Sequence, residues 1–201
     1  MLGTNTLKGI TAYKAFRHFV KSDESKKANS MLESRYLSAA TKPLSVSAMT
    51  TTGLALSKLS ANKKIEKFFF RAALSSTIAG MMNAALKRII GRKRPRADSG
   101  PAYNGPTMQD KYNSMPSGHA AAIAAVAGSI PKTSGPLLAA SAAGCLATAL
   151  IGKTRTMRDA HRVSDVLIGS CIGFAASYLV SKIDGPSSDE NSVIEHYQNK
   201  A

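Results

Sequence analysis

Three short stretches of the chain place histidines, a carboxylate and basic residues at spacings that suit phosphate chemistry. PSGH occupies residues 116–119, KRIIGRKRPR occupies 87–96, and TRTMRDAHRVSD occupies 154–165, with a His–Asp pair at His161 and Asp165. Imidazoles act as nucleophiles and as general acids or bases. Lysine and arginine side chains bind phosphate oxygens, as do the free N–H groups at the start of a helix. These residue types predict a site for phosphate binding or phosphoryl transfer.

Each stretch also has a simpler structural interpretation. Residues 116–118 are ordinary choices for the start of a helix. The basic stretch 87–96 is equally typical of a nucleic-acid patch or of the cytoplasmic flank of a membrane span. Being four residues apart, His161 and Asp165 share one face if both lie on a helix, where the carboxylate fixes the imidazole tautomer. Such a pair is more often structural, although an ionisable residue at the membrane end of an apolar segment is costly and usually functional.

The composition favours closely packed helices and an anionic partner. Hydrophobic residues make up 44% of the 201 residues, but tryptophan is absent and alanine supplies much of the apolar content. The formal net charge is +15, which points to nucleic acid, an anionic membrane surface or a phosphorylated substrate. Cys145 and Cys171 both lie in apolar runs and are expected to be reduced packing residues.

Five apolar segments separate the polar stretches and are long enough to consider as membrane spans. They cover residues 43–57, 68–86, 118–130, 136–152 and 163–181. The mean hydropathy of −0.09 would suit a soluble helical bundle, whereas the small residues of these segments would let membrane helices approach closely. We expect an all-α membrane bundle of about five transmembrane helices. With alternating spans, His119, Asp165 and the basic cluster around Lys93 converge at one end of it.

The same pattern divides the chain into three parts. Residues 1–42 are expected to form a basic, amphipathic, peripheral segment, and a solvated helix packed on the domain and a transit peptide stay open as alternatives. Residues 43–183 form the membrane domain, and residues 184–201 form a polar tail.

The spacing of the polar residues resembles a known signature. Lys87 is followed after six residues by Arg94-Pro95, then comes the PSGH stretch, and Arg155 is followed after five residues by His161 and after three more by Asp165. This order resembles the three-part signature of the type 2 phosphatidic acid phosphatase (PAP2) superfamily, which includes vanadium haloperoxidases and bacterial acid phosphatases. The resemblance extends over residues 43–181.

The chain departs from that signature at its third part. The family usually has Ser-Arg where this chain has Thr154-Arg155, which keeps the hydroxyl. Arg158 and Asp159 add charge where relatives commonly carry apolar or small residues. These differences concern the pocket for the leaving group more than the reaction.

The resemblance implies a role for each motif residue. His161 is implied to be the nucleophile that forms a phosphohistidine, Asp165 to orient it, and His119 to be the general acid and later the base. The residues implied to bind the phosphate are Lys87, Arg94, Ser117, Gly118 and Arg155.

The resemblance also implies a substrate and a location. Neither a metal nor a cofactor is expected, because three cations surround the phosphate and acidic residues are few. The expected substrate is a lipid phosphate or diphosphate of the phosphatidate, phosphatidylglycerophosphate, polyprenyl diphosphate or lipid A type. The expected location is an integral membrane position, in the inner or plasma membrane if the protein is bacterial, with membrane lipids as partners and no nucleic acid. The side of the membrane that holds the site is left open.

Two alternatives remain open at this point. One is a soluble relative of the acid phosphatase or haloperoxidase kind. The other is a catalytically inactive, basic membrane-binding protein, in which Arg92 and Lys93 matter and His161 does not.

Overall fold

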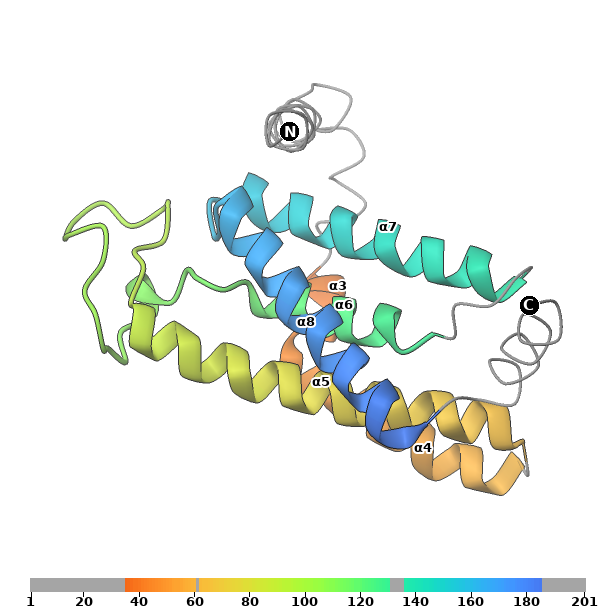
Figure 1. The fold of residues 1–201 in the computed structure, drawn as a ribbon. Helices are drawn as coiled ribbons and strands as arrows, with labels where there is room; N and C mark the ends of the chain where they lie inside the picture. The colour runs from red at the N-terminus through yellow and green to blue at the C-terminus, as the bar shows by residue number, and fades with distance from the viewer. Residues whose placement is uncertain (1–34, 61, 131–135, 186–201) are drawn as a thin grey trace, which may run out of the picture.

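The computed structural model describes residues 35–60, 62–130 and 136–185, and the described chain is helical (Figure 1). Its helices are α3 (Arg35–Ala40), α4 (Pro43–Ser57), α5 (Lys63–Ile90), α6 (Gly118–Gly128), α7 (Pro136–Met157) and α8 (Val163–Asp184). Short 3-10 turns occur at Lys58–Ser60 and Asp110–Tyr112. Within the described residues the β-type pairing is an isolated bridge between Arg92 and Tyr103. The predicted all-α class is confirmed.

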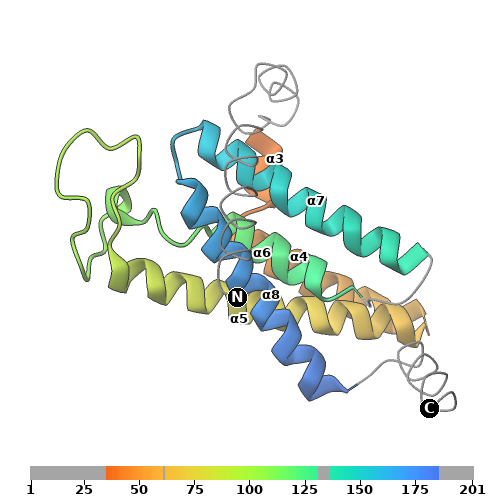
Figure 2. The same ribbon diagram turned by 45° about the horizontal axis from the view of Figure 1, so that its top comes forward.

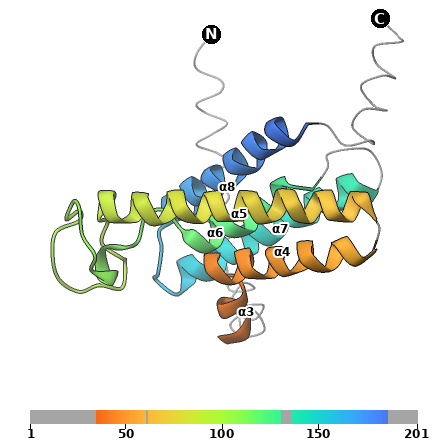
Figure 3. The same ribbon diagram turned by 90° about the horizontal axis from the view of Figure 1, so that it is seen from below.

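Alanine-rich packing around α6 forms the centre of the bundle. Helix α6 packs against α5, α7 and α8 (Figure 2), and α5 lies between α4 and α8 (Figure 3). The fully buried alanines of α6 are Ala120, Ala121, Ala122, Ala124 and Ala125. Gly173 of α8 faces this helix so closely that a Cβ there would collide with the backbone of Ala121. Small side chains therefore let the helix backbones approach each other closely, as the alanine-rich composition predicts.

The ends of α5 fix the start of the loop that leads to the site. At its N-terminus the Asn62 side chain accepts hydrogen bonds from the backbone N–H groups of Lys64 and Ile65. At its C-terminus Gly91 adopts a left-handed conformation with φ of 56°, where an added Cβ would run into the Gly105 carbonyl. The helix therefore stops at Ile90, three residues after Lys87, and the chain turns into the loop 91–117.

The five apolar segments are all helical, but the structure supports membrane crossing for one of them. Among the described residues, only Val163–Asp184 is long and apolar enough to span a bilayer. Helix α6 has 11 residues, about 16 Å at 1.5 Å per residue, against a hydrocarbon core of about 30 Å. Five transmembrane helices therefore remain a prediction.

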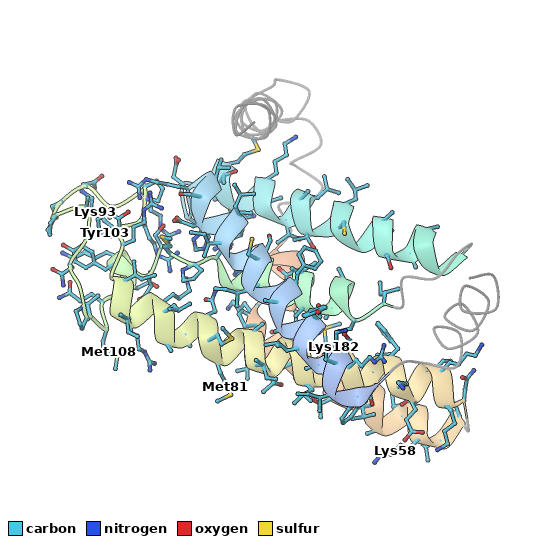
Figure 4. The ribbon with its side chains drawn as sticks, viewed as in Figure 1. Lys58, Met81, Lys93, Tyr103, Met108 and Lys182 are labelled. Atoms are coloured by element: carbon cyan, nitrogen blue, oxygen red, sulfur yellow. The ribbon has the colours of Figure 1, made fainter. Side chains whose placement is uncertain are left out.

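The outer faces of the helices nevertheless expose large apolar side chains. Met81, 70% exposed, points away from the bundle (Figure 4). Other such helical residues, each at least 46% exposed, are Leu44, Met49, Leu56, Ile89, Leu146, Leu167, Tyr178, Leu179 and Ile183. They lie on four helices, so the apolar surface surrounds much of the bundle rather than forming one patch.

A buried ion pair ties the far ends of α5 and α8 together. Arg71 is 3% exposed, and its Nε donates to Asp184 Oδ2 at 2.7 Å. A second guanidinium N–H donates to the Gly185 carbonyl. Asp184 is the last residue of α8, and the predicted division of the chain into three parts stays a prediction.

Candidate active site

The motif residues meet at one end of the bundle, where α5 ends, α6 begins, α7 ends and α8 begins (Figure 1). Hydrogen bonds join these ends directly. The Ser117 N–H donates to the Asp165 carbonyl at 2.8 Å, and Arg94 Nη1 donates to the Ala160 carbonyl at 3.4 Å. The structure thus places His119, Asp165 and the basic cluster around Lys93 at the same end of the bundle, as the alternation of spans predicts.

His161 lies between α7 and α8 with its ring buried, 3% exposed. Its Nδ1 is 2.5 Å from the Ser114 carbonyl oxygen. A carbonyl can only accept, so Nδ1 carries the proton and the lone pair of the neutral ring lies on Nε2. Burial, with Lys87 next in size, lowers the pKa of His161 to about 2. The ring is therefore neutral at physiological pH and has the tautomer that a nucleophilic Nε2 requires.

Asp165 does not lie beside His161 in the way the spacing predicts. Helix α8 begins at Val163, so His161 precedes the helix and does not share a face with Asp165. The Asp165 carboxylate is fully buried and binds Arg92 Nη1 at 2.6 Å and the Ser114 hydroxyl at 2.6 Å. The prediction of a shared helix face is wrong, because Asp165 occupies the first turn and caps the backbone N–H of Arg162 at 2.8 Å.

The charges of three basic residues, Lys87, Arg155 and Arg94, act on His161, and the resemblance implies that all three bind the phosphate. Lys87 Nζ donates to the Asn113 carbonyl at 2.7 Å, and burial, followed by the Arg94 charge, lowers its pKa to about 7. Burial, followed by Arg158, lowers the pKa of Arg155 to about 10, so Arg155 stays charged at neutral pH. Arg94 is paired in this structure, with Nη2 2.8 Å from Asp110 Oδ1. An anion would relieve the mutual repulsion of these cations.

Two buried donors at the site have no protein partner among the described residues. They are Ser117 Oγ, at the start of α6, and Arg155 Nε. Ser117 is 0% exposed, and an unpaired buried polar group costs about 1–3 kcal/mol. Gly118 follows directly, and a Cβ there would approach Pro43 Cγ at 3.0 Å, so the helix start is tightly enclosed. Unpaired donors beside clustered cations suit an anionic ligand.

Ser38 of α3 is a site residue that the sequence did not predict. Its carbonyl oxygen accepts a hydrogen bond from His119 Nε2 at 3.2 Å, and its hydroxyl accepts one from Arg155 Nη1 at 3.3 Å. Ser38 therefore binds both His119, the implied general acid, and Arg155, one of the implied phosphate ligands. Residues 1–42 were expected to be peripheral, and no pattern around Ser38 indicates otherwise.

Because Ser38 occupies both groups, we expect that substrate must displace it. In Ser38→Asp, a carboxylate at this position would pair with Arg155 and compete with phosphate. A charge-assisted hydrogen bond contributes about 1.5–3 kcal/mol, which would raise KM about tenfold or more with kcat unchanged. Steady-state kinetics would measure this, with Ala39→Asp as a control because Ala39 is exposed and receives the same charge. An equal rise of KM in both variants would contradict a direct effect at Arg155.

Ser114 and Arg92 are further site residues that sequence reasoning missed. Both lie inside or beside the quoted motifs, but no spacing rule identifies them, because their contacts depend on the path of the loop 91–117. No group of three or more His, Cys, Asp or Glu side chains that could hold a metal occurs within the part of the chain that the structure describes. Metal independence stays a prediction, which chelation tests.

Comparison with known proteins gives one match. A family model described as the PAP2 superfamily matches residues 68–188, which is more than half of the chain. The matched range contains every residue that the sequence predicts for the site, and it leaves out α3 and α4. No curated protein and no solved structure matches the chain.

Proposed function

Because this chain belongs to the PAP2 superfamily, we propose that it is a phosphatase that hydrolyses a lipid phosphate or diphosphate through a phosphohistidine at His161. The observation that carries this proposal is the state of the His161 ring. The ring is buried and neutral, its Nδ1–H is held by the Ser114 carbonyl, and the charges of Lys87 and Arg155 act on it. That combination suits attack by Nε2 on a phosphorus atom whose oxygens are neutralised by the cations.

The proposed reaction has two steps. In the first, His161 Nε2 forms a bond to phosphorus, the bond from phosphorus to the leaving oxygen breaks, and protonated His119 gives its Nε2 proton to that oxygen. Burial, followed by the Arg155 charge, lowers the pKa of His119 to about 4 in the substrate-free protein, so the negative charge of the bound phosphate has to raise this pKa before the step. In the second, neutral His119 takes a proton from water, the hydroxide attacks phosphorus, and the bond to His161 breaks to release phosphate. Since Ser38 holds His119 Nε2 in this structure, the carbonyl of Ser38 has to move away before the first step.

The phosphate oxygens would be held by the cations and the start of α6. The charges of Lys87 and Arg155 act on His161, and so does the charge of Arg94, which is paired with Asp110 in this structure. The unpartnered Ser117 hydroxyl supplies a further donor, together with the Gly118 N–H. One well-placed donor of this kind contributes about 3–4 kcal/mol to the transition state.

A lipid is favoured as the carrier of the phosphate because of the apolar surface. One helix is long and apolar enough to span a bilayer, and large hydrophobic side chains are exposed on four helices. Such a surface suits contact with acyl or prenyl chains while the headgroup enters the polar end. A soluble phosphatase is the second candidate, because the described residues contain a single candidate span and the buried core helix of a soluble protein can have the same length and hydropathy. Extraction of the native membrane with carbonate separates the two: release into the aqueous phase would favour the soluble candidate.

The first test is phosphate release from purified protein in detergent with EDTA. The panel would contain phosphatidate, phosphatidylglycerophosphate, a polyprenyl diphosphate, a lipid A type phosphate and a water-soluble phosphate ester. We expect release that persists in EDTA and is faster for at least one lipid than for the soluble ester. Absence of release from every compound would contradict the proposed phosphatase, and loss of release in EDTA would contradict its metal independence.

The lowered pKa of Lys87 predicts the alkaline limb of the pH profile. A lysine with a pKa of about 7 is charged below that pH and becomes neutral above it. Phosphate binding to the free enzyme should therefore weaken as the pH rises through this value, which gives an alkaline limb in the inhibition constant of inorganic phosphate. In Lys87→Arg the charge persists, so the limb should move upward by about one pH unit or more. Titration of the substrate affects both proteins equally, so an unchanged limb in the variant would contradict this assignment.

A further inference from the structure

Arg92 and Ser114 lie outside the implied catalytic set but form a closed network with Asp165 and His161. We propose that Arg92 and Ser114 are positioning residues for His161: Arg92 holds Asp165, Asp165 holds Ser114, and the Ser114 carbonyl holds the imidazole ring. This inference rests on the proposed function in that His161 is taken as the nucleophile. It differs from the simple expectation, in which the carboxylate of Asp165 would contact the ring itself.

Asp165 is the centre of this network. Its side chain is fully buried, and an ionised carboxylate in that position needs both a countercharge and hydrogen bonds. Arg92 Nη1 supplies the countercharge at 2.6 Å from Oδ1 and also donates to the Ser164 hydroxyl at 2.8 Å. Oδ2 accepts from the Ser114 hydroxyl and from the Arg162 N–H. The carboxylate is therefore fixed from three directions.

Ser114 connects the Asp165 carboxylate to the imidazole ring of His161. It is 0% exposed, and its three polar groups are all engaged. Its N–H donates to the Arg92 carbonyl at 3.0 Å, its hydroxyl donates to Asp165, and its carbonyl accepts from His161 Nδ1. The first contact uses the Arg92 main chain, and the second uses the carboxylate that the Arg92 side chain binds. The direction of the carbonyl, and with it the ring, is thus set by Arg92 and Asp165.

The consequence for chemistry is the choice of tautomer. A ring held at Nδ1–H presents its lone pair at Nε2, whereas a ring released from the carbonyl can also adopt the Nε2–H form, which cannot attack phosphorus. Holding the correct tautomer and orientation is the established task of a carboxylate beside a catalytic histidine. Here a serine carbonyl does it, and the carboxylate acts through that serine.

Arg92 also has a matched control beside it in the chain. Lys93 carries the same charge in the same loop, but its Nζ donates to the Gly100 carbonyl in an exposed position, beyond the end of α5 (Figure 4). A Lys93→Met change removes one positive charge from the loop without touching the network. Arg92→Met removes one charge and leaves Asp165 without its countercharge, and Arg92→Lys keeps the charge.

The test reads the tautomer of His161 directly, by the ¹⁵N shifts of the imidazole in full-length protein in detergent. The chain has four histidines, and His161→Ala identifies the signal. We expect the Nδ1–H form in the wild type, in Lys93→Met and in Arg92→Lys, and a mixture of tautomers in Arg92→Met and Ser114→Ala. Phosphorylation of the enzyme should slow about a hundredfold in Arg92→Met, with the inhibition constant of inorganic phosphate unchanged.

The possible outcomes separate this inference from the proposed function. An unmixed Nδ1–H form in both Arg92→Met and Ser114→Ala would overturn the inference, whatever the activity of the protein. Weaker phosphate inhibition of Arg92→Met at an unchanged phosphorylation rate would also overturn it, because Arg92 would then bind phosphate. If Arg92→Met does not fold, Ser114→Ala decides, since it removes one hydroxyl and keeps the carbonyl. A wild type with the expected tautomer but no phosphatase activity would contradict the proposed function alone.

Discussion

Replacing His161 by alanine is expected to abolish phosphate release from every substrate that the wild type hydrolyses. The proposed reaction forms a bond between phosphorus and His161 Nε2, and no other described side chain shares the buried, neutral, Nδ1-held state of this ring. Removal of a covalent nucleophile typically lowers kcat by about four orders of magnitude or more. Phosphate release by wild type and variant, measured side by side at saturating substrate, checks this expectation.

Loss of folding has to be separated from loss of the nucleophile. His161 is buried and holds the Ser114 carbonyl, so the variant is expected to unfold at a somewhat lower temperature. Comparison of the thermal melts of wild type and His161→Ala in the same detergent shows whether the bundle persists. A folded His161→Ala protein with a tenth or more of the wild-type rate would contradict the role of His161 as the nucleophile.

Replacing His119 by glutamine is expected to give the second large effect, and one that depends on the leaving group. A lipid alkoxide is a poor leaving group and needs the proton of His119, so its release should slow about a hundredfold to ten-thousandfold. A nitrophenolate leaves without a proton, so the first step with nitrophenyl phosphate should change far less. Glutamine keeps an N–H donor for the Ser38 carbonyl, which His119 Nε2 contacts at 3.2 Å.

The second step provides a further check on His119. Water has no base in the variant, so the phosphoenzyme formed from nitrophenyl phosphate should accumulate, with a burst of nitrophenolate followed by slow turnover. Equal losses with the lipid and the nitrophenyl ester, and no burst, would show that His119 does not act as the acid and base.

The sequence was most informative about elements and motif spacing. The apolar segment predicted at 43–57 has the bounds of α4, and the segment at 163–181 begins where α8 begins, because runs of apolar residues bounded by Pro, Gly and charged residues define helices well. The motif spacing also indicated the PAP2 superfamily, which the match of the family model over residues 68–188 confirms.

The contacts made by individual polar groups could not be predicted. The spacing of His161 and Asp165 suggested one helix, but the cap of α8 at Arg162 leaves His161 outside it. Ser114 contacts His161 only because the loop 91–117 returns to the end of α5, and Ser38 contacts His119 across 81 residues of sequence. Such contacts are set by tertiary packing, which hydropathy and motif patterns do not encode.

The most direct test of the account is to trap the phosphoenzyme and locate the phosphate. Wild type and His119→Gln would be mixed with substrate in EDTA, quenched in alkali, where phosphohistidine survives, and analysed by mass spectrometry of the peptide that contains His161. We predict phosphate on His161 in both proteins and more of it in His119→Gln. Steady turnover with phosphate on another residue, or on none, would contradict the central claim that His161 is the nucleophile.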